Sequence, residues 1–374
     1  MRILLALLLT LSLAACQVTR PETAASVAAI TPQEAVDVNS VQAGALDPVN
    51  ALMTPHLKIL SLSGGGVDGA WSAGVLNGWT ELGTRPNFDV VAGVSTGALV
   101  AVLAFLGSDY DALLKRLYTD VREEDIFRRR GVTGLLGDSI FDNNPLKAMI
   151  ERTVTPALVE QVAEEHRKGR RLYVATVNLD SSETVVWNMG ALAAGERNGR
   201  ANKVQTFQKI LRASAAIPVF FPPVYLKPKR GVQLRQAHVD GGIKTPVILS
   251  DFLFKRPARK RDLYVIVNGQ LALEDSNAPI EANLKSIAGK TVASMTRELM
   301  QQTLYRGYVR AQNTGTNFRL TAIPESVPPP ADALTFEEGY LKRVYELGRV
   351  SVKTSDFWWR IPPTVKTFDR VSMR

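Results

Sequence analysis

The stretch KILSLSGGGVDGAWSAGVLNGWT, residues 58–80, places an apolar run, a group of glycines and a helical pattern one after another. The run LKILSL (57–62) predicts a short buried strand, and apolar residues recur at helical spacing from 70 to 82. Between them, Gly64, Gly66 and Gly69 spell GxGxxG, a pattern that holds dinucleotides in a strand–turn–helix unit. The stretch therefore predicts the opening of an α/β domain, with a glycine loop at its first turn.

The rest of the chain continues this alternation. FDVVAGV (88–94) predicts a second strand, and STGALVAVLAFLG (95–107) predicts a helix closed by Gly107. Asn144 with Pro145 and Thr155 with Pro156 each mark the start of a further helix. The remaining predicted strands are 171–179, 184–189, 237–240 and 262–269, and the remaining predicted helices are 205–213, 287–312 and 336–352. This order predicts a parallel sheet with helical crossovers.

The second predicted strand decides between two uses of the glycine loop. A dinucleotide-binding fold places an acidic residue at the far end of this strand, but Asp89 lies at the near end. The far end carries GVSTG (93–97), the GxSxG pattern that puts a nucleophilic serine, here Ser95, on a sharp strand-to-helix turn. We therefore interpret the amides of Gly64, Gly65 and Gly66 as an oxyanion hole, with the amide of Thr96 as a further donor. The alternative is that these are simple turn glycines.

A serine nucleophile needs a base, and the chain has only three histidines, His56, His166 and His238, none of them after Asp240. We expect His166, in a charged helix end, to lie at the solvent surface. Asp240 ends a predicted strand, and we interpret it as the base that takes the proton directly from Ser95, provided that burial raises its pKa. A triad of Ser95, His238 and an earlier aspartate remains the alternative to this Ser–Asp dyad.

Four segments together resemble the patatin-like phospholipase family: SGGGVDG (63–69), GVSTG (93–97), ASAAIPVFFPPV (213–224) and DGG (240–242). The resemblance covers 57–352. It implies a three-layer α/β/α sandwich with a mainly parallel sheet, no cofactor and no metal. It also implies hydrolysis of lipid acyl esters through an acyl-serine intermediate, as in a phospholipase A, a lysophospholipase or an esterase. In this family pattern Ser95 is the nucleophile, Asp240 the general base, and Gly64, Gly65 and Gly66 the oxyanion hole.

Two positions depart from the family pattern. Ser63 stands where aspartate is usual, and Asp68 stands where a basic residue is usual. A carboxylate at 68 disfavours an anion beside the hole, and therefore disfavours the phosphate of a phospholipid headgroup but not acyl esters in general. Asp68 as a solvent-facing helix cap is an equal alternative. The departure also leaves open a non-catalytic lipoprotein that binds lipid or a partner protein on the same fold.

Two apolar clusters have more than one interpretation. Residues of the proline-bearing segment either line an acyl-binding groove or form a rigid core turn; they are Ser214, Pro218, Phe220, Phe221, Pro222 and Pro223. Trp358 and Trp359 are expected to pack on the domain, with insertion into a lipid interface as the alternative.

The first sixteen residues, MRILLALLLTLSLAAC, are organised as an export signal, with an apolar run too short to span a bilayer. Their last four resemble a bacterial lipobox, which implies that Cys16 is acylated, as with palmitate, and becomes the N-terminus. Gln17 then favours the outer membrane, so we expect a lipid-anchored protein of the bacterial cell envelope that faces the periplasm. Residues 17–55 predict a flexible tether and 56–374 a single catalytic domain.

The charge of the chain is basic, with 45 Lys and Arg against 36 Asp and Glu, for a net charge of +9. A solvated basic surface explains this excess, and attraction to anionic lipid headgroups is the alternative. The basic residues are not interleaved with aromatic residues in a stripe, so we expect no nucleic-acid partner. We expect the partner to be membrane lipid; the sequence does not indicate an oligomeric state.

Overall fold

The computed structural model describes residues 54–131, 137–195, 203–226, 235–271, 279–330 and 332–363. The predicted signal peptide, Cys16 and the predicted tether up to residue 53 lie outside this part of the chain. The first strand begins at Thr54, so the last two residues assigned to the tether belong to the sheet.

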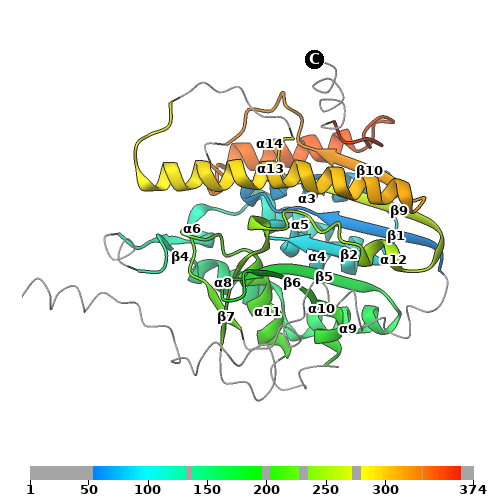
Figure 1. Cartoon of the computed structure of the whole chain (residues 1–374), viewed down its shortest axis with the longest axis horizontal. Helices are drawn as coiled ribbons and strands as arrows, with labels where there is room; N and C mark the ends of the chain where they lie inside the picture. The colour runs from blue at the N-terminus through cyan, green and yellow to red at the C-terminus, as the bar shows by residue number, and fades with distance from the viewer. Residues whose placement is uncertain are drawn as a thin grey trace, which may run out of the picture.

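One eight-stranded sheet forms the centre of the molecule (Figure 1). Strands that are hydrogen-bonded to one another follow in the order β10 (Asn317–Ala322), β9 (Ala258–Val267), β1 (Thr54–Leu62), β2 (Val90–Val94), β5 (Arg171–Asn178), β8 (Gln236–Asp240) and β7 (Val224–Leu226). The remaining strand, β6 (Glu183–Asn188), also pairs with β5. The strands from β10 to β5 are parallel, whereas β6, β7 and β8 are antiparallel to their partners. The predicted mixed α/β fold with a mainly parallel sheet is confirmed.

Helices surround the sheet. They are α3 (Gly69–Glu81), α4 (Thr96–Leu106), α5 (Asp111–Thr119), α6 (Glu123–Ile126), α8 (Asn144–Thr153), α9 (Pro156–Arg167), α10 (Met189–Ala194), α11 (Lys203–Ser214), α12 (Phe252–Lys255), α13 (Leu284–Asn313) and α14 (Glu338–Ser351). The 3-10 helices are η3 (Gly66–Asp68), η4 (Ser108–Tyr110) and η6 (Gly241–Ile243), and β3 (Arg128–Arg129) pairs with β4 (Phe141–Asp142) as a separate hairpin.

Two apolar clusters cover the two faces of the sheet, which gives three layers. Alternate residues of β1 show the division: Leu60 and Leu62 pack with the larger cluster, and Leu57 and Ile59 with the other. The larger cluster contains side chains of α3, α4, α5, α8, α9, α10, α11 and α14. The smaller cluster contains side chains of α12, α13 and 247–249.

The register of β5 explains why residues distant in sequence meet. Val94, the last residue of β2, pairs with Ala175, and Asp240, the last residue of β8, pairs with Thr176. Because β6 occupies the other edge of β5, β2 and β8 lie end to end on the same edge and point toward each other. The residues that follow these two strand ends are therefore neighbours.

Most predicted elements are present, but the prediction omitted β10, β7 and several short helices. Trp358 packs against Trp79 and Tyr264, with ring centroids 4.9 and 5.2 Å apart, which confirms the packing interpretation for that residue. Trp359 forms backbone hydrogen bonds with Leu320 at the edge of the sheet. Within the described residues, no helix combines the length and apolar composition needed to cross a membrane.

Candidate active site

Ser95 occupies the sharp turn between β2 and α4. Its φ of 55° and ψ of −128° lie outside the regions that non-glycine residues favour, and such strain persists only where surrounding structure holds it. The backbone N–H of Ser95 donates to Ser214 Oγ at 3.0 Å, and Ser214 Oγ donates to the carbonyl of Ala175 at 2.7 Å. Ser214, considered in the sequence as a groove residue, therefore fixes the turn to strand β5.

Glycines on both sides of Ser95 allow this turn to pack. A Cβ at Gly93 would lie 2.2 Å from the carbonyl oxygen of Gly97, and a Cβ at Gly97 would lie 2.3 Å from the carbonyl oxygen of Ser63. The GxSxG spacing is thus required by contact between β2, α4 and the glycine loop.

Asp240 lies next to Ser95 because β8 ends against the end of β2. Its side chain is 4% exposed, and burial raises the pKa of its carboxyl from 3.8 to about 6. The nearby Ser95 hydroxyl and the backbone N–H of Gly242 oppose this rise in pKa, and the N–H of Gly242 donates to Oδ1 at 2.7 Å. The N–H of Gly242 therefore holds Oδ1 of Asp240 in place, and the carboxyl also interacts with the Ser95 hydroxyl, as the dyad requires.

The glycine loop differs in one donor from the predicted oxyanion hole. The amide of Gly64 donates to the carbonyl of Pro246 at 3.1 Å, so it is already engaged, and this corrects the assignment of all three glycines as free donors. Within the described chain, the amides of Gly65 and Gly66 have no acceptor. Gly64 still has a steric role, since a Cβ there would lie 3.0 Å from Cβ of Ser95.

Both free amides belong to residues that only glycine fits. Gly65 has a φ of 156° and Gly66 a φ of 59°. Added Cβ atoms would lie 1.9 Å from the carbonyl oxygen of Asn268 and 2.0 Å from that of Ala333, respectively. The loop is therefore held between the end of β9 and the segment before α14.

Asn268 was not identified from the sequence, although it follows β9, a parallel neighbour of β1, at the same sheet edge. Its side-chain amide donates to the carbonyl of Ser63 at 2.8 Å, and its backbone N–H donates to Ser63 Oγ at 2.8 Å. Its Oδ1 accepts from the backbone N–H of Ser72 at 3.2 Å. Ser63, in place of the usual aspartate, thus links the glycine loop to β9.

Asp68 lies just beyond the loop, as the residue before α3, but it forms no helix cap with its side chain. Its Oδ1 accepts a hydrogen bond from the Tyr340 hydroxyl of α14 at 2.6 Å, so the capping interpretation is wrong. Burial raises the pKa of Asp68 to about 6, and the Tyr340 hydrogen bond opposes the rise. The position that usually carries a basic residue instead connects the loop to α14.

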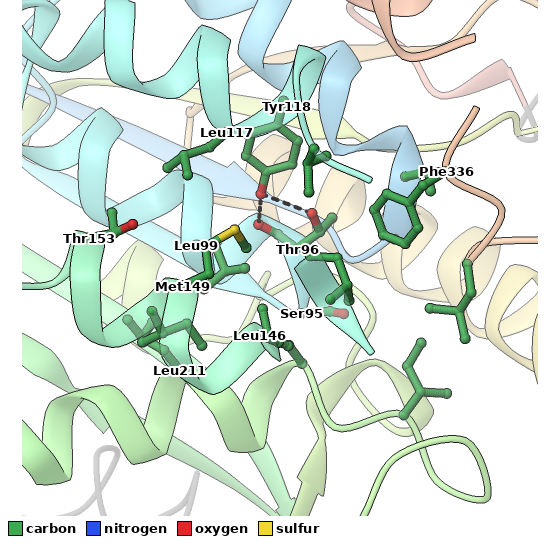
Figure 2. A pocket seen from close by; sticks show the side chains of 18 of the residues that line it. Ser95, Thr96, Leu99, Leu117, Tyr118, Leu146, Met149, Thr153, Leu211 and Phe336 are labelled. Carbon is green, nitrogen blue, oxygen red and sulfur yellow. Dashed lines mark hydrogen bonds between the residues drawn. The ribbon is translucent and has the colours of Figure 1, made fainter. Parts of the chain in front are cut away.

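An apolar pocket opens beside Ser95 (Figure 2). Figure 2 shows Ser95 and Phe336 on one side of the pocket and Thr153 and Leu211 on the other. Its lining comprises Gly66, Val67, Ser95, Thr96, Leu99, Val102, Leu103, Leu117, Tyr118, Val121, Ile126, Leu146, Met149, Ile150, Thr153, Val154, Leu211, Ala215, Ile217, Phe221, Leu334, Phe336 and Leu341. Only the glycine loop, the serine turn and the proline-bearing segment of this lining lie in sequence motifs, and the other lining residues, most of them on helices, carry no motif.

The few polar side chains in the pocket largely satisfy one another. The Tyr118 hydroxyl donates to the carbonyl of Thr96 at 2.9 Å and lies 2.9 Å from Thr96 Oγ1 (Figure 2). Of the proline-bearing segment, Phe221 lines the pocket, whereas Phe220 is buried against Phe141. The groove interpretation therefore holds for part of that segment and the core interpretation for the rest.

The histidines lie apart from this chemistry. His166 is 4% exposed, so the expected surface position is wrong; the small residue Gly190 of α10 packs directly on its ring. His238 Nδ1 hydrogen-bonds Thr176 Oγ1 at 2.9 Å, and burial lowers the pKa of its imidazole to about 4. The ring of His238 thus bonds Thr176 and not Ser95. This arrangement does not favour a triad of Ser95, His238 and an aspartate. Among the described residues, no group of three or more potential metal ligands is present.

Comparisons with known proteins agree with the motifs. The family model for patatin-like phospholipases matches residues 60–253, more than half of the chain. A curated relative, a cGAMP-activated phospholipase from Escherichia coli (strain TW11681), is 24% identical over 212 residues, which cover 53% of this chain and 55% of the relative. The chain thus spans about half the length of that relative.

Solved structures show more distant similarity. VipD from Legionella pneumophila aligns with a TM-score of 0.40 and 13% identity, over 79% of this chain and 66% of VipD. Human GIVD cytosolic phospholipase A2 aligns with a TM-score of 0.39 and 12% identity, over 85% of this chain and 62% of the human chain.

Proposed function

Because the chain belongs to the patatin-like phospholipase family, we propose that it is a lipid acyl hydrolase that uses Ser95 and Asp240 as its catalytic dyad. The observation that carries the proposal is the position of Ser95, a strained serine that contacts a buried carboxylate and borders an apolar pocket. A strained turn with this combination is typical of an activated nucleophile.

The proposed reaction has two acyl-transfer steps. Ser95 Oγ attacks the carbonyl carbon of the ester while Asp240 takes the hydroxyl proton, and the carbonyl oxygen becomes an oxyanion held by the amides of Gly65 and Gly66. Collapse of this intermediate expels the alcohol, which takes the proton from Asp240 and leaves an acyl-Ser95 ester. Asp240 then deprotonates a water molecule that attacks the acyl group, and collapse releases the fatty acid and returns the proton to Ser95.

The pocket supports an acyl chain as the part of the substrate that enters the protein. Its lining is apolar except for a few groups, and binding sites of this kind bury most of an apolar ligand. The name of the curated relative supports a phospholipid, and a lysophospholipid or a simpler ester uses the same pocket and the same chemistry.

Fluorophosphonate labelling tests the nucleophile. The wild-type protein should be labelled and should hydrolyse p-nitrophenyl esters, with kcat/KM rising as the acyl chain lengthens toward the capacity of the pocket. Ser95→Ala should abolish both labelling and turnover. Equal turnover by Ser95→Ala would overturn the assignment, and a folded wild-type protein without turnover would instead support the lipid- or partner-binding alternative.

The proposed setting is a membrane, to which acylated Cys16 anchors the chain. Support comes from the lipobox-like sequence alone. Two or more acyl chains bind stably because each buried methylene contributes about 0.8 kcal/mol. Cys16→Ser should prevent metabolic incorporation of labelled palmitate, and unchanged incorporation would contradict the anchor.

A further inference from the structure

We propose that Leu334 and Phe336 are positioning residues: an acyl chain that packs against them holds the glycine loop in place, so that chain length acts on kcat. This rests on the proposed function, because the glycine loop affects kcat only as an oxyanion hole. The basis is one short segment, 332–341, which contacts both the glycine loop and the apolar pocket.

The segment contacts the glycine loop at two points. The carbonyl of Ala333 accepts a hydrogen bond from the backbone N–H of Val67 at 3.1 Å, and a Cβ at Gly66 would lie 2.0 Å from the same carbonyl oxygen. Farther along, the Tyr340 hydroxyl donates to Asp68 at 2.6 Å. The proposed oxyanion donor Gly66 and the two residues after it are therefore held by this segment.

Other side chains of the same segment line the apolar pocket. They are Leu334, Phe336 and Leu341, and the lining that they share includes Ser95 and Gly66. Figure 2 shows Phe336 on the side of the pocket where Ser95 lies. The segment thus alternates between residues that hold the loop and residues that would contact an acyl chain.

A hydrogen-bonded turn joins the two sets of contacts. Asp332 Oδ1 accepts from the backbone N–H of Leu334 at 2.9 Å and from Thr335 Oγ1 at 3.0 Å. The backbone N–H of Thr335 also donates to the carbonyl of Asp332 at 3.1 Å. Leu334, 7% exposed, directly follows Ala333, so the turn fixes a pocket side chain relative to the carbonyl that contacts the loop.

The consequence concerns how the binding energy of the acyl chain is used. Contacts remote from the reacting carbonyl can orient catalytic groups, and a misplacement of about 1 Å can cost about 10²-fold in rate. An octanoyl chain has methylenes to pack against Leu334 and Phe336, whereas an acetyl group has none. A longer chain should therefore keep the segment seated on the loop and raise kcat, in addition to lowering KM.

Steady-state kinetics on p-nitrophenyl acetate and octanoate test this in the full chain. In the wild type, kcat should be several-fold higher for octanoate. Phe336→Ala removes part of the contact with the chain and keeps the loop contacts of Ala333 and Tyr340, so the ratio of the two kcat values should fall toward one. Leu334→Ala should lower the ratio in the same way, and thermal melts show whether either variant remains folded.

The matched control for these kinetics is Met149→Ala. Met149 also lines the pocket and is half-buried like Phe336, but it belongs to α8 and not to the segment. This variant should raise KM for octanoate and keep most of the rise in kcat with chain length. An unchanged kcat ratio in Phe336→Ala would overturn the proposal, because it would show only general support of the loop. A wild type in which chain length changes KM alone would also overturn it.

Amide hydrogen exchange separates this proposal from the proposed catalysis. The full chain carries Ser95→Ala, and n-octane replaces the acyl chain because an alkane has no acceptor for the loop amides. Octane should slow exchange of the Val67 N–H, which donates to Ala333, several-fold, and adding Phe336→Ala should abolish the slowing. Unchanged exchange at Val67 with octane bound would overturn the proposal even in an active enzyme. Slowed exchange in a protein without turnover would support the link between pocket and loop and contradict only the proposed function.

Discussion

Two carboxyl groups at the same edge of the sheet have similar acid–base properties but different partners. Burial raises the pKa of both Asp240 and Asp68 to about 6. Asp240 interacts with the hydroxyl of Ser95, on a strained turn that borders the pocket, whereas Asp68 accepts from the phenol of Tyr340, which is 4% exposed. The raised pKa is thus shared by a buried carboxyl, Asp240, and a half-buried one, Asp68, and only the chemistry of the partner distinguishes a proposed base from a structural acceptor.

The largest expected difference between the two groups is in turnover. Asp240→Asn removes the group that takes the proton from Ser95, so kcat should fall by about 10²–10⁴-fold on a soluble p-nitrophenyl ester. Asp68→Asn keeps an oxygen for the Tyr340 hydroxyl and should retain kcat within about tenfold of the wild type. Steady-state kinetics measure both, with circular dichroism to confirm folding. Equal losses of kcat in Asp240→Asn and Asp68→Asn would mean that the difference in hydrogen-bond partner does not distinguish the roles of the two carboxyl groups.

A substitution in the glycine loop next to Asp68 sharpens the comparison. It tests the backbone amides of the loop separately from the carboxyl group beside them. Gly66→Ala places a Cβ 2.0 Å from the carbonyl oxygen of Ala333 and should misplace the oxyanion donors, for a loss in kcat of about 10²–10³-fold. Gly83→Ala is the matched control, since Gly83 also has a positive φ, 72°, but nothing lies within 4 Å of its added Cβ. A similar kcat for both variants would contradict the assigned oxyanion hole.

The pH profile identifies which carboxyl controls the reaction. Asp240 must be deprotonated to act as a base, and its pKa is about 6, so kcat/KM should fall about tenfold per pH unit as the pH drops below 6. Asp68→Asn should leave this acidic limb in place. Loss of the limb in Asp68→Asn would assign it to Asp68, and the roles argued for the two groups would be reversed.

The sequence predicted those parts of the site that depend on local backbone geometry. GxSxG and the glycine loop can be recognised because a tight turn or a free amide excludes larger side chains, and Gly66 and Gly97 show this in their contacts. Apart from the pairing of Ser95 with Asp240, which the family pattern implies, the long-range contacts of the site could not be predicted. The acceptor for the Gly64 amide is Pro246, and the donor to Asp68 is Tyr340, 272 residues away. No spacing rule connects such residues.

The elements of the fold also divide into those that local sequence predicts and those that depend on long-range contacts. The strands β1, β2, β5 and β9 were predicted because parallel strands buried on both faces are continuous apolar runs. β10, with sequence NFRLTA, lies at the sheet edge and includes exposed and polar positions, so its pattern resembles a loop. His166 was misplaced because its neighbours are charged, although its own ring lies under Gly190.

The smallest expected effect is on stability, and its sign follows from the raised pKa values. A carboxyl whose pKa is higher in the folded state contributes stability that is complete below its unfolded pKa and is lost as the pH rises through its folded pKa. For Asp240, the change from 3.8 to about 6 corresponds to roughly 3 kcal/mol lost by pH 8. Asn has no charge to bury, so Asp240→Asn and Asp68→Asn should each raise Tm by a few degrees at pH 8 and by much less at pH 5.

Tyr340→Phe provides the opposite change for Asp68 alone. It removes the hydrogen bond that lowers the pKa of Asp68, so the carboxylate becomes more costly to bury and Tm should fall more at pH 8 than at pH 5. Thermal melts of the three variants at both pH values measure these differences. If Asp240→Asn lowered Tm at pH 8 as Tyr340→Phe does, the carboxylate of Asp240 would be stabilised by its surroundings, and its pKa would not be raised. The proposed base would then lack the property that makes it effective near neutral pH.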